Sequence, residues 1–307
     1  MSADDNLANP PPRRDRRTLV LGAAAAALLI FALLFEGFCQ IYARLVVFPS
    51  LEALRQSDRH FYRASENPVL GYELKPSSKF VNGDRVLRIN RFGIRDDSDE
   101  LFDEKRKLAI LGDSVVFGMG HTQEETIPGR VQQQIDPDGE RVKVLNFSVA
   151  GYAITQLLVQ LQEKNRIYDV DDVVYLLNFN DFARHDSVYE GADNGNFRIY
   201  VRPTFMSAFF VRKAVYRMQK GDRFGSERWY RWFYNGNEER GQTLLSDMAR
   251  YGRDEGFRFG VVLLPSGLSY SEHGYGLRDI HERGHDVACD LQPLLQGAVR
   301  HRDAIER

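Results

Sequence analysis

This sequence contains few cysteines and carries little net charge. Its 307 residues include two cysteines, Cys39 and Cys289, which lie far apart, so neither a disulfide framework nor a zinc site can be read from them. The formal net charge is −2, which gives no overall basic footprint, so we expect no nucleic-acid partner. No internal repeat is visible, and the length allows one large domain or two small ones.

Charge is missing altogether from one stretch near the amino terminus, Leu19 to Phe35. Continued through Ile41, this apolar run reaches the roughly 20 residues that cross a bilayer. The arginines that crowd against its amino end are Arg13, Arg14, Arg16 and Arg17. We therefore predict a cytoplasmic tail at residues 1–17 and a transmembrane anchor at residues 18–40. The positive-inside rule then sends the rest of the chain to the periplasm or the cell exterior.

A cleaved signal peptide and a lipoprotein signal fit this apolar run less well. A signal peptide usually has an apolar core of about 7–15 residues, and no clear small-x-small cleavage site follows here. A lipoprotein signal at Cys39 would resemble such signals elsewhere in having a small residue before the cysteine, whereas bulky Phe38 stands there. A retained anchor is the interpretation that we favour.

Residues 41–104 are expected to form a juxtamembrane stalk followed by a small β arm. Ile41 to Tyr62 alternates apolar and charged residues at helical spacing, which predicts a helix that continues the anchor. We expect this segment to be a solvated spacer rather than a packed element. Asn67 to Pro76 and Val86 to Arg95 are rich in turn residues and short strands. We expect this arm mainly to pack, although Asn90, Gly93 and Arg95 could instead shape the rim of a site.

An apolar run from Leu108 to Leu111 stops abruptly at Gly112-Asp113-Ser114. Such a continuous run is typical of a parallel strand covered on both faces. A sharp turn at Gly112 would leave Ser114 at the carboxyl end of the strand, where open α/β sheets bind their ligands. The same three residues also make an ordinary turn and helix cap, so this motif alone leaves both interpretations open.

Two later segments have the same form. Val142 to Gly151 and Asp172 to Asp181 are β-rich apolar runs that end in small or amide residues. Each can bring one residue, Gly151 or Asn180, to the sheet edge that carries Ser114. Helix-like runs alternate with the strands, which predicts an α/β fold with helices on both faces of a parallel sheet.

Periodicity and turn residues predict the remaining elements. Helices are expected at residues 124–134, 152–167 and 240–251, a strand at 257–264 and a short fifth strand at 287–289. Gly252 is expected to stop the third of these helices.

The segments at the ends of the three predicted strands resemble motifs of the SGNH (GDSL) hydrolase family, and the resemblance covers about residues 67–295. That family has a Gly-Asp-Ser serine, a downstream glycine and a Gly-x-Asn-Asp asparagine, matched here by Ser114, Gly151 and Asn180. The resemblance implies a three-layer, flavodoxin-like parallel sheet with Ser114 as nucleophile. It also implies an oxyanion hole that includes Gly151 and Asn180, and it requires neither a metal nor an organic cofactor.

The chain departs from the family pattern in two places. Asn178 stands where the family usually has glycine, which bears on the loop around Asn180. The family also supplies its general base as Asp-x-x-His, and this chain contains no such sequence. We therefore expect either that the reading frame continues beyond Arg307 or that the protein has lost its base. The weaker candidates for a substitute are His281, His285 and His301.

Two acidic residues lie beside the proposed site. We expect Asp113 and Asp181 to cap helices and tie loops rather than to transfer protons.

An insertion at about residues 182–240 interrupts the regular alternation of strands and helices. Its many aromatic residues argue against disorder, and its arginines are offset by few acidic residues. It is expected to form either a basic aromatic lid or a second small core whose arginines face water. A lid of this kind would suit an acidic glycan, a lipid headgroup or the membrane surface.

These observations predict an SGNH hydrolase-like domain at residues 105–307, anchored in a membrane. Its expected activity is cleavage or transfer of an O-acyl group, most plausibly acetyl, on a cell-envelope polysaccharide or a lipid-linked substrate. The alternative is a catalytically degenerate domain that binds glycan or serves as an assembly partner in the envelope. The sequence does not indicate an oligomeric state.

Overall fold

The computed structural model describes residues 16–56, 61–82, 85–184, 200–220 and 236–264. Within these ranges the central sheet has four parallel strands in the order β6-β5-β7-β8. The strands are β5 (Arg106–Leu111), β6 (Val142–Asn146), β7 (Asp172–Leu177) and β8 (Arg258–Leu263). This confirms the predicted α/β class, and the order matches the first four strands of a flavodoxin-like sheet. The strand expected at 287–289 lies outside the described residues.

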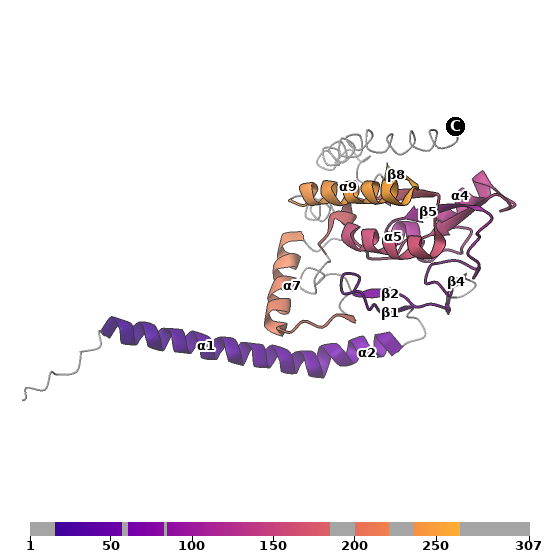
Figure 1. The fold of residues 1–307 in the computed structure, drawn as a ribbon. Helices are drawn as coiled ribbons and strands as arrows, with labels where there is room; N and C mark the ends of the chain where they lie inside the picture. The colour runs from indigo at the N-terminus through magenta and orange to yellow at the C-terminus, as the bar shows by residue number, and fades with distance from the viewer. Residues whose placement is uncertain (1–15, 57–60, 83–84, 185–199, 221–235, 265–307) are drawn as a thin grey trace, which may run out of the picture.

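Helices cover both faces of the sheet. They are α4 (Ile127–Ile135), α5 (Ile154–Tyr168) and α9 (Glu238–Glu255), of which α5 and α9 lie side by side on one face (Figure 1). Ala109 and Leu111 of β5 join the larger core with α5 and α9, whereas Ile110 packs with Ile127 of α4. Because a strand sends successive side chains to opposite faces, a continuous apolar run is what a doubly covered strand requires.

The third helix does not end at Gly252, as the sequence led us to expect. α9 continues through Gly252 and stops at Gly256, whose φ of 84° gives the left-handed C-cap. An added Cβ at Gly252 would lie 2.8 Å from the ring of Phe257. Close packing against the following strand therefore explains this glycine, and the predicted stop at Gly252 is wrong.

The residues between α2 and the parallel sheet form two antiparallel strand pairs that pack into the main core. The pairs are β1 (Tyr62–Ala64) with β2 (Tyr72–Leu74) and β3 (Ser78–Asn82) with β4 (Arg85–Ile89). Leu70, Tyr72, Ile89 and Ile94 are fully buried in the same cluster as the sheet residues. The packing role that we expected for the arm is therefore present.

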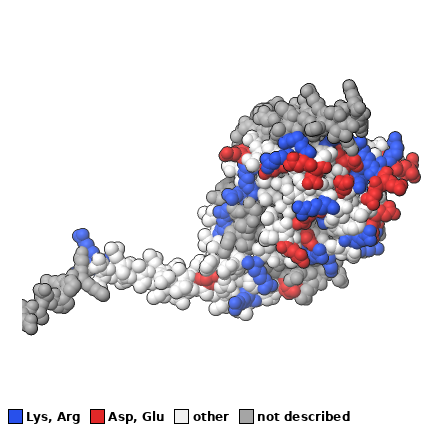
Figure 2. Space-filling model, in the orientation of Figure 1, with Lys and Arg blue, Asp and Glu red and all other residues white. Residues whose placement is uncertain are grey.

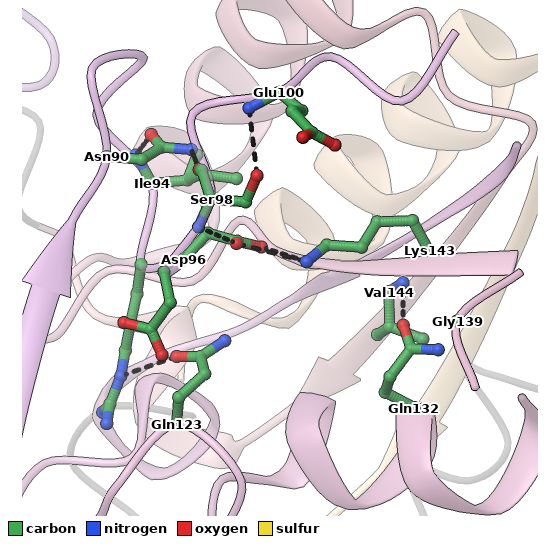
Figure 3. A network of polar contacts seen from close by, with 12 residues as sticks. Asn90, Ile94, Asp96, Ser98, Glu100, Gln123, Gln132, Gly139, Lys143 and Val144 are labelled. Carbon is green, nitrogen blue, oxygen red and sulfur yellow. Dashed lines mark hydrogen bonds and ion pairs between the residues drawn. The ribbon is translucent and has the colours of Figure 1, made fainter. Parts of the chain in front are cut away.

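Polar contacts also join the arm to the sheet (Figure 3). The Asn90 side chain accepts from the backbone N–H of Ile94 at 3.2 Å and so closes the turn after β4. Asp96 accepts from the backbone N–H of Ser98 at 2.8 Å and forms an ion pair of 2.9 Å with Lys143 of β6. Asp96 is buried, so replacing Lys143 would leave a carboxyl without its charge partner and destabilise the arm.

A long amino-terminal helix projects from this body. α1 (Arg16–Tyr42) continues through the π-helical turn η1 (Ala43–Val47) into α2 (Phe48–Gln56). Residues 16–50 form the one helix in the described ranges that is long and apolar enough to cross a membrane. Figure 2 shows the projecting part mostly white, with blue near its outer end. The helix begins with two basic residues, Arg16 and Arg17.

The segment after the anchor is helical to Gln56, as predicted, but it is not a solvated spacer throughout. Ala43 is fully buried and Cys39 nearly so, in a cluster with Met206 and Phe209. The last two belong to α7 (Met206–Lys220), the helix that the structure describes within the 182–240 insertion. Part of the insertion therefore packs against the end of α1 and the start of η1. Residues 185–199 and 221–235 of the insertion lie outside the described ranges.

Candidate active site

The three residues predicted for the site follow three neighbouring strands. Ser114 begins the short helix α3 (Ser114–Phe117) just after β5, and Gly151 lies in the loop after β6. Asn180 lies in η2 (Phe179–Phe182), which follows β7. Because the three strands are parallel, their carboxyl ends and these residues share one edge of the sheet.

The turn before Ser114 depends on close approach between backbone and side chains. An added Cβ at Gly112 would lie 2.9 Å from Cβ of Val116 and 3.2 Å from the carbonyl oxygen of Leu176. Only glycine lets the chain pass from β5 into α3 this close to β7. Asp113 is the N-cap of α3, and its Oδ1 accepts from the backbone N–H of Val115 at 2.9 Å, which confirms its expected capping role.

The second carboxylate oxygen of Asp113 links the serine turn to Asn180. This Oδ2 accepts from Nδ2 of Asn180 at 2.9 Å. One buried carboxyl, 1% exposed, therefore holds both the backbone at Ser114 and the amide of Asn180. Ser114 and Asn180 themselves are partly exposed, so both face the rim of the sheet rather than its core.

The loop that carries Gly151 runs beside the serine turn. The backbone N–H of Val149 donates to the carbonyl of Gly112 at 3.3 Å. Tyr72 of the arm donates to the carbonyl of Ala150 at 2.8 Å, and the hydroxyl of Tyr152 donates back to the carbonyl of Tyr72. Gly151 lies between these two clamped residues, is exposed and has a φ of 85°, a conformation that favours glycine.

The asparagine loop is held by Asp181. Its Oδ2 accepts from the Tyr175 hydroxyl and from the backbone N–H of Asn178, each at 2.9 Å. Burial, and next the charge of Asp113, raise the pKa of Asp181 well above its usual value. Asn178, which replaces the glycine of the family pattern, is extended with φ −110°. Its backbone therefore needs no glycine, and Asp181 ties the loop as expected.

Arg95 is a neighbour of the site whose role the sequence did not indicate. Its guanidinium is 1% exposed and lies under the loop that follows α3. It donates to the carbonyl oxygens of Phe117 at 2.8 Å and Gly118 at 2.6 Å, to that of His121, and to Oε1 of Gln123 at 3.2 Å. In the sequence, the arginine directly follows apolar Ile94. This position predicts packing or a place on the rim of a site, but it does not indicate which groups the guanidinium binds.

No general base can be assigned among the described residues. His121 is the one histidine within the described ranges; it is exposed, and its Nδ1 lies 3.6 Å from Glu125. The predicted substitutes, His281, His285 and His301, fall outside those ranges. The part of the chain that the structure describes also holds no group of three or more His, Cys, Asp or Glu side chains suited to a metal ion.

An open hollow of about 610 Å³ lies where the amino ends of α5 and α9 meet. Thr155, Arg184 and Arg240 line it together with Glu239 and Asn237. Arg240 also donates to the hydroxyl of Thr155. α5 follows the Gly151 loop and Arg184 follows η2, so some residues that line the hollow come directly after two of the three site loops in the sequence. The hollow offers mainly cationic and hydroxyl groups.

Comparisons with known proteins identify structural likeness without a family. No protein-family model matches the sequence, and no curated protein matches it. The chain is similar to a crystal structure of TesA at 16% identity and TM-score 0.35, over 60% of this chain and 74% of that one. It is also similar to the psychrotrophic esterase EstA from Pseudoalteromonas sp. at 15% identity and TM-score 0.32, over 66% of this chain and 100% of that one. Neither likeness is close enough to assign a family or an activity.

Proposed function

We propose that this chain is a membrane-anchored, serine-dependent O-acyl ester hydrolase or acyltransferase of the SGNH type. The observation that carries the proposal is the 2.9 Å hydrogen bond from Asn180 to Asp113, the residue before Ser114. It ties together the turns of two of the three motif residues, which lie 66 positions apart in the chain. A turn-and-cap motif alone would need the hydrogen bond from the backbone N–H of Val115 to Asp113, but it would not need Asn180.

The proposed reaction begins with attack of Ser114 Oγ on the acyl carbonyl. A bond forms between Oγ and the carbonyl carbon, and the serine proton passes to a general base. The backbone N–H groups of Ser114 and Gly151 and the second N–H of the Asn180 amide stabilise the oxyanion. The C–O bond to the alcohol then breaks, the alcohol takes the proton, and an acyl-serine remains. Water or a second hydroxyl group removes the acyl group and regenerates Ser114.

The substrate proposed is an acyl ester, most plausibly acetyl, on an envelope polysaccharide or a lipid-linked glycan. The anchor supports this choice because it would keep the domain at a membrane surface. The arginines that precede α1 support an orientation with the domain in the periplasm or outside the cell. Arg184 and Arg240 in the hollow suit a substrate that carries negative charge.

A fluorophosphonate probe tests the nucleophile directly. Full-length protein in detergent is treated with the probe, digested and analysed by mass spectrometry. We expect the adduct on the peptide that contains Ser114, and we expect Ser114→Ala to abolish it. Ser148→Ala is the matched control, because Ser148 is buried in the neighbouring loop, where its hydroxyl donates to the carbonyl of Ile110 at 3.3 Å. An adduct that survives Ser114→Ala would refute the assignment.

A degenerate binding domain is the second candidate function. It is supported by one observation, that residues 1–307 contain no Asp-x-x-His sequence. Such a domain would bind acylated glycan without turnover and without a probe adduct. Binding that is unaffected by Ser114→Ala, together with an unlabelled Ser114, would favour it over the enzyme.

A further inference from the structure

The amino end of α7 is fixed to the anchor helix by one carboxylate. Oε1 of Glu36 accepts from the backbone N–H of Met206 at 2.9 Å, and Oε2 accepts from that of Ser207 at 2.9 Å. Gln40, one turn further along α1, donates to the carbonyl of Thr204 at 2.9 Å. Glu36 therefore satisfies two N–H groups that the first turn of α7 leaves without intrahelical partners.

Apolar contacts reinforce this junction. Cys39 and Ala43 are buried against Met206 and Phe209. The ring of Phe210 packs edge-on against Tyr42, with the centroids 5.7 Å apart. The contact is specific enough to hold α7 in a fixed direction relative to α1.

The junction lies at the level where the anchor would leave the lipid. An α-helix rises about 1.5 Å per residue, so the 19 steps from Arg17 to Glu36 span about 29 Å, close to the ~30 Å hydrocarbon core of a bilayer. Figure 1 shows that α7 runs across the direction of α1, at the edge of the body from which α1 projects. With α1 along the membrane normal, α7 runs along the membrane surface.

The outward side of α7 is apolar although it is exposed. Val211, Val215 and Met218 are 52%, 39% and 75% exposed. Together with exposed Ala208, they recur at spacings of three and four residues and so form one stripe. The opposite side carries the buried Met206, Phe209 and Tyr216. A helix that is apolar on two sides is expected to have a second apolar environment besides the protein.

The charge of α7 has a single sign. The helix contains arginines and lysines and no acidic residue. Arg212 and Arg217 are exposed, and Arg202, just before the helix, stacks over the ring of Phe48 at 4.5 Å. Basic residues beside an exposed apolar stripe are the composition of helices that lie in the interface of an anionic membrane.

We propose that α7 is a second membrane contact, an in-plane helix whose Ala208–Val211–Val215–Met218 stripe enters the headgroup region of an anionic bilayer. Glu36 sets its depth, because it ties the start of α7 to the point where α1 leaves the hydrocarbon core. The α/β domain is then held at one tilt over the surface instead of swinging from a single tether. This inference rests on the proposed anchoring by α1 and is independent of any catalytic activity.

Spin labels on the full-length protein in vesicles of phosphatidylglycerol and phosphatidylcholine test the proposal. Single cysteines are introduced as Val215→Cys and Val211→Cys in a Cys39→Ala, Cys289→Ser background. Ile135→Cys, an exposed aliphatic position at the end of α4, is the matched control. We expect the α7 labels to be about tenfold less accessible than the control to a water-soluble nickel chelate, because interfacial helices lie about 5–10 Å into the headgroup boundary. The difference should shrink in phosphatidylcholine alone.

A label at Leu28→Cys separates this inference from the anchor itself. If the Leu28 label is protected at the depth of the bilayer centre while the α7 labels are as accessible as that at Ile135, the anchor holds and the proposal for α7 is wrong. Dipolar coupling between Val215 labels on different molecules would also overturn it, because a second copy would then cover the stripe. If the α7 labels were equally protected from the nickel chelate in vesicles with phosphatidylglycerol and in phosphatidylcholine alone, the role given to the arginines would be contradicted.

Discussion

Replacement of Arg95 by methionine tests how the loop after Ser114 is held. Methionine keeps most of the aliphatic volume but removes every donor, so the carbonyls of Phe117 and His121 lose the guanidinium as partner in a site where Arg95 is 1% exposed. The carbonyl of Gly118 loses one of two donors and keeps the backbone N–H of His121 at 3.1 Å. Leaving a buried acceptor without a partner costs about 1–3 kcal/mol each. Allowing for partial rehydration of the loop, we expect Arg95→Met to lower the free energy of unfolding by about 4 kcal/mol.

Arg91→Met is the matched control for this variant. Arg91 is exposed, and its guanidinium stacks on the ring of Phe92 at 4.5 Å, so its loss should change the free energy of unfolding by about 0.5 kcal/mol or less. Urea unfolding of both variants in the same detergent gives the comparison, provided that the slope with denaturant is unchanged. A loss for Arg95→Met as small as that for Arg91→Met would refute the role assigned to the buried guanidinium.

Three further predictions concern the serine, the buried acid and the membrane topology. Ser114→Ala should change the free energy of unfolding by no more than about 1 kcal/mol, since the N-cap is Asp113 rather than the serine; a collapse in thermal stability would indicate a structural role. The pKa of Asp181 is raised in the folded state, so the stability that it contributes is complete below its unfolded pKa, near 3.8, and is lost as pH rises toward the folded pKa. Asp181→Asn should therefore flatten the fall in urea stability above about pH 4, and an unchanged pH profile would count against a neutral Asp181. A reporter that is active only in the cytoplasm, fused after Arg307, should give no signal; a strong signal would reverse the proposed topology.

Several features of the fold were accessible from the sequence because they depend on local patterns. The continuous apolar run at 108–111 predicted a doubly covered strand, and the β-rich runs at 142–151 and 172–181 predicted two more strands. All three overlap strands of the parallel sheet. Small and amide residues at their ends indicated which edge carries the site. Asp113 as a helix cap follows from the same local chemistry.

The remaining features depend on residues far apart in the chain. Gly252 resembles a helix stop, but the glycine accommodates the ring of Phe257, the residue before β8. Packing or a place on a rim could be predicted for Arg95, but its partners come from the loop after α3. Ala43 was expected in a solvated spacer, and α7 covers it from more than 160 residues away. Neither helical periodicity nor turn propensity indicates which distant residues will pack against these positions. The histidines proposed as a general base, His281, His285 and His301, lie outside the described residues.

Hydrolysis of an activated aryl acetate by the full-length protein tests the role of Ser114 most directly. Wild type, Ser114→Ala and Asn180→Ala are compared at equal concentration, with Ser148→Ala as a folded control. We predict that Ser114→Ala removes all hydrolysis above the uncatalysed rate. Asn180→Ala should lower turnover by about 10²–10³-fold if a general base is in place, and by much less if it is not. Hydrolysis by Ser114→Ala at the wild-type rate would contradict the assignment of Ser114 as nucleophile.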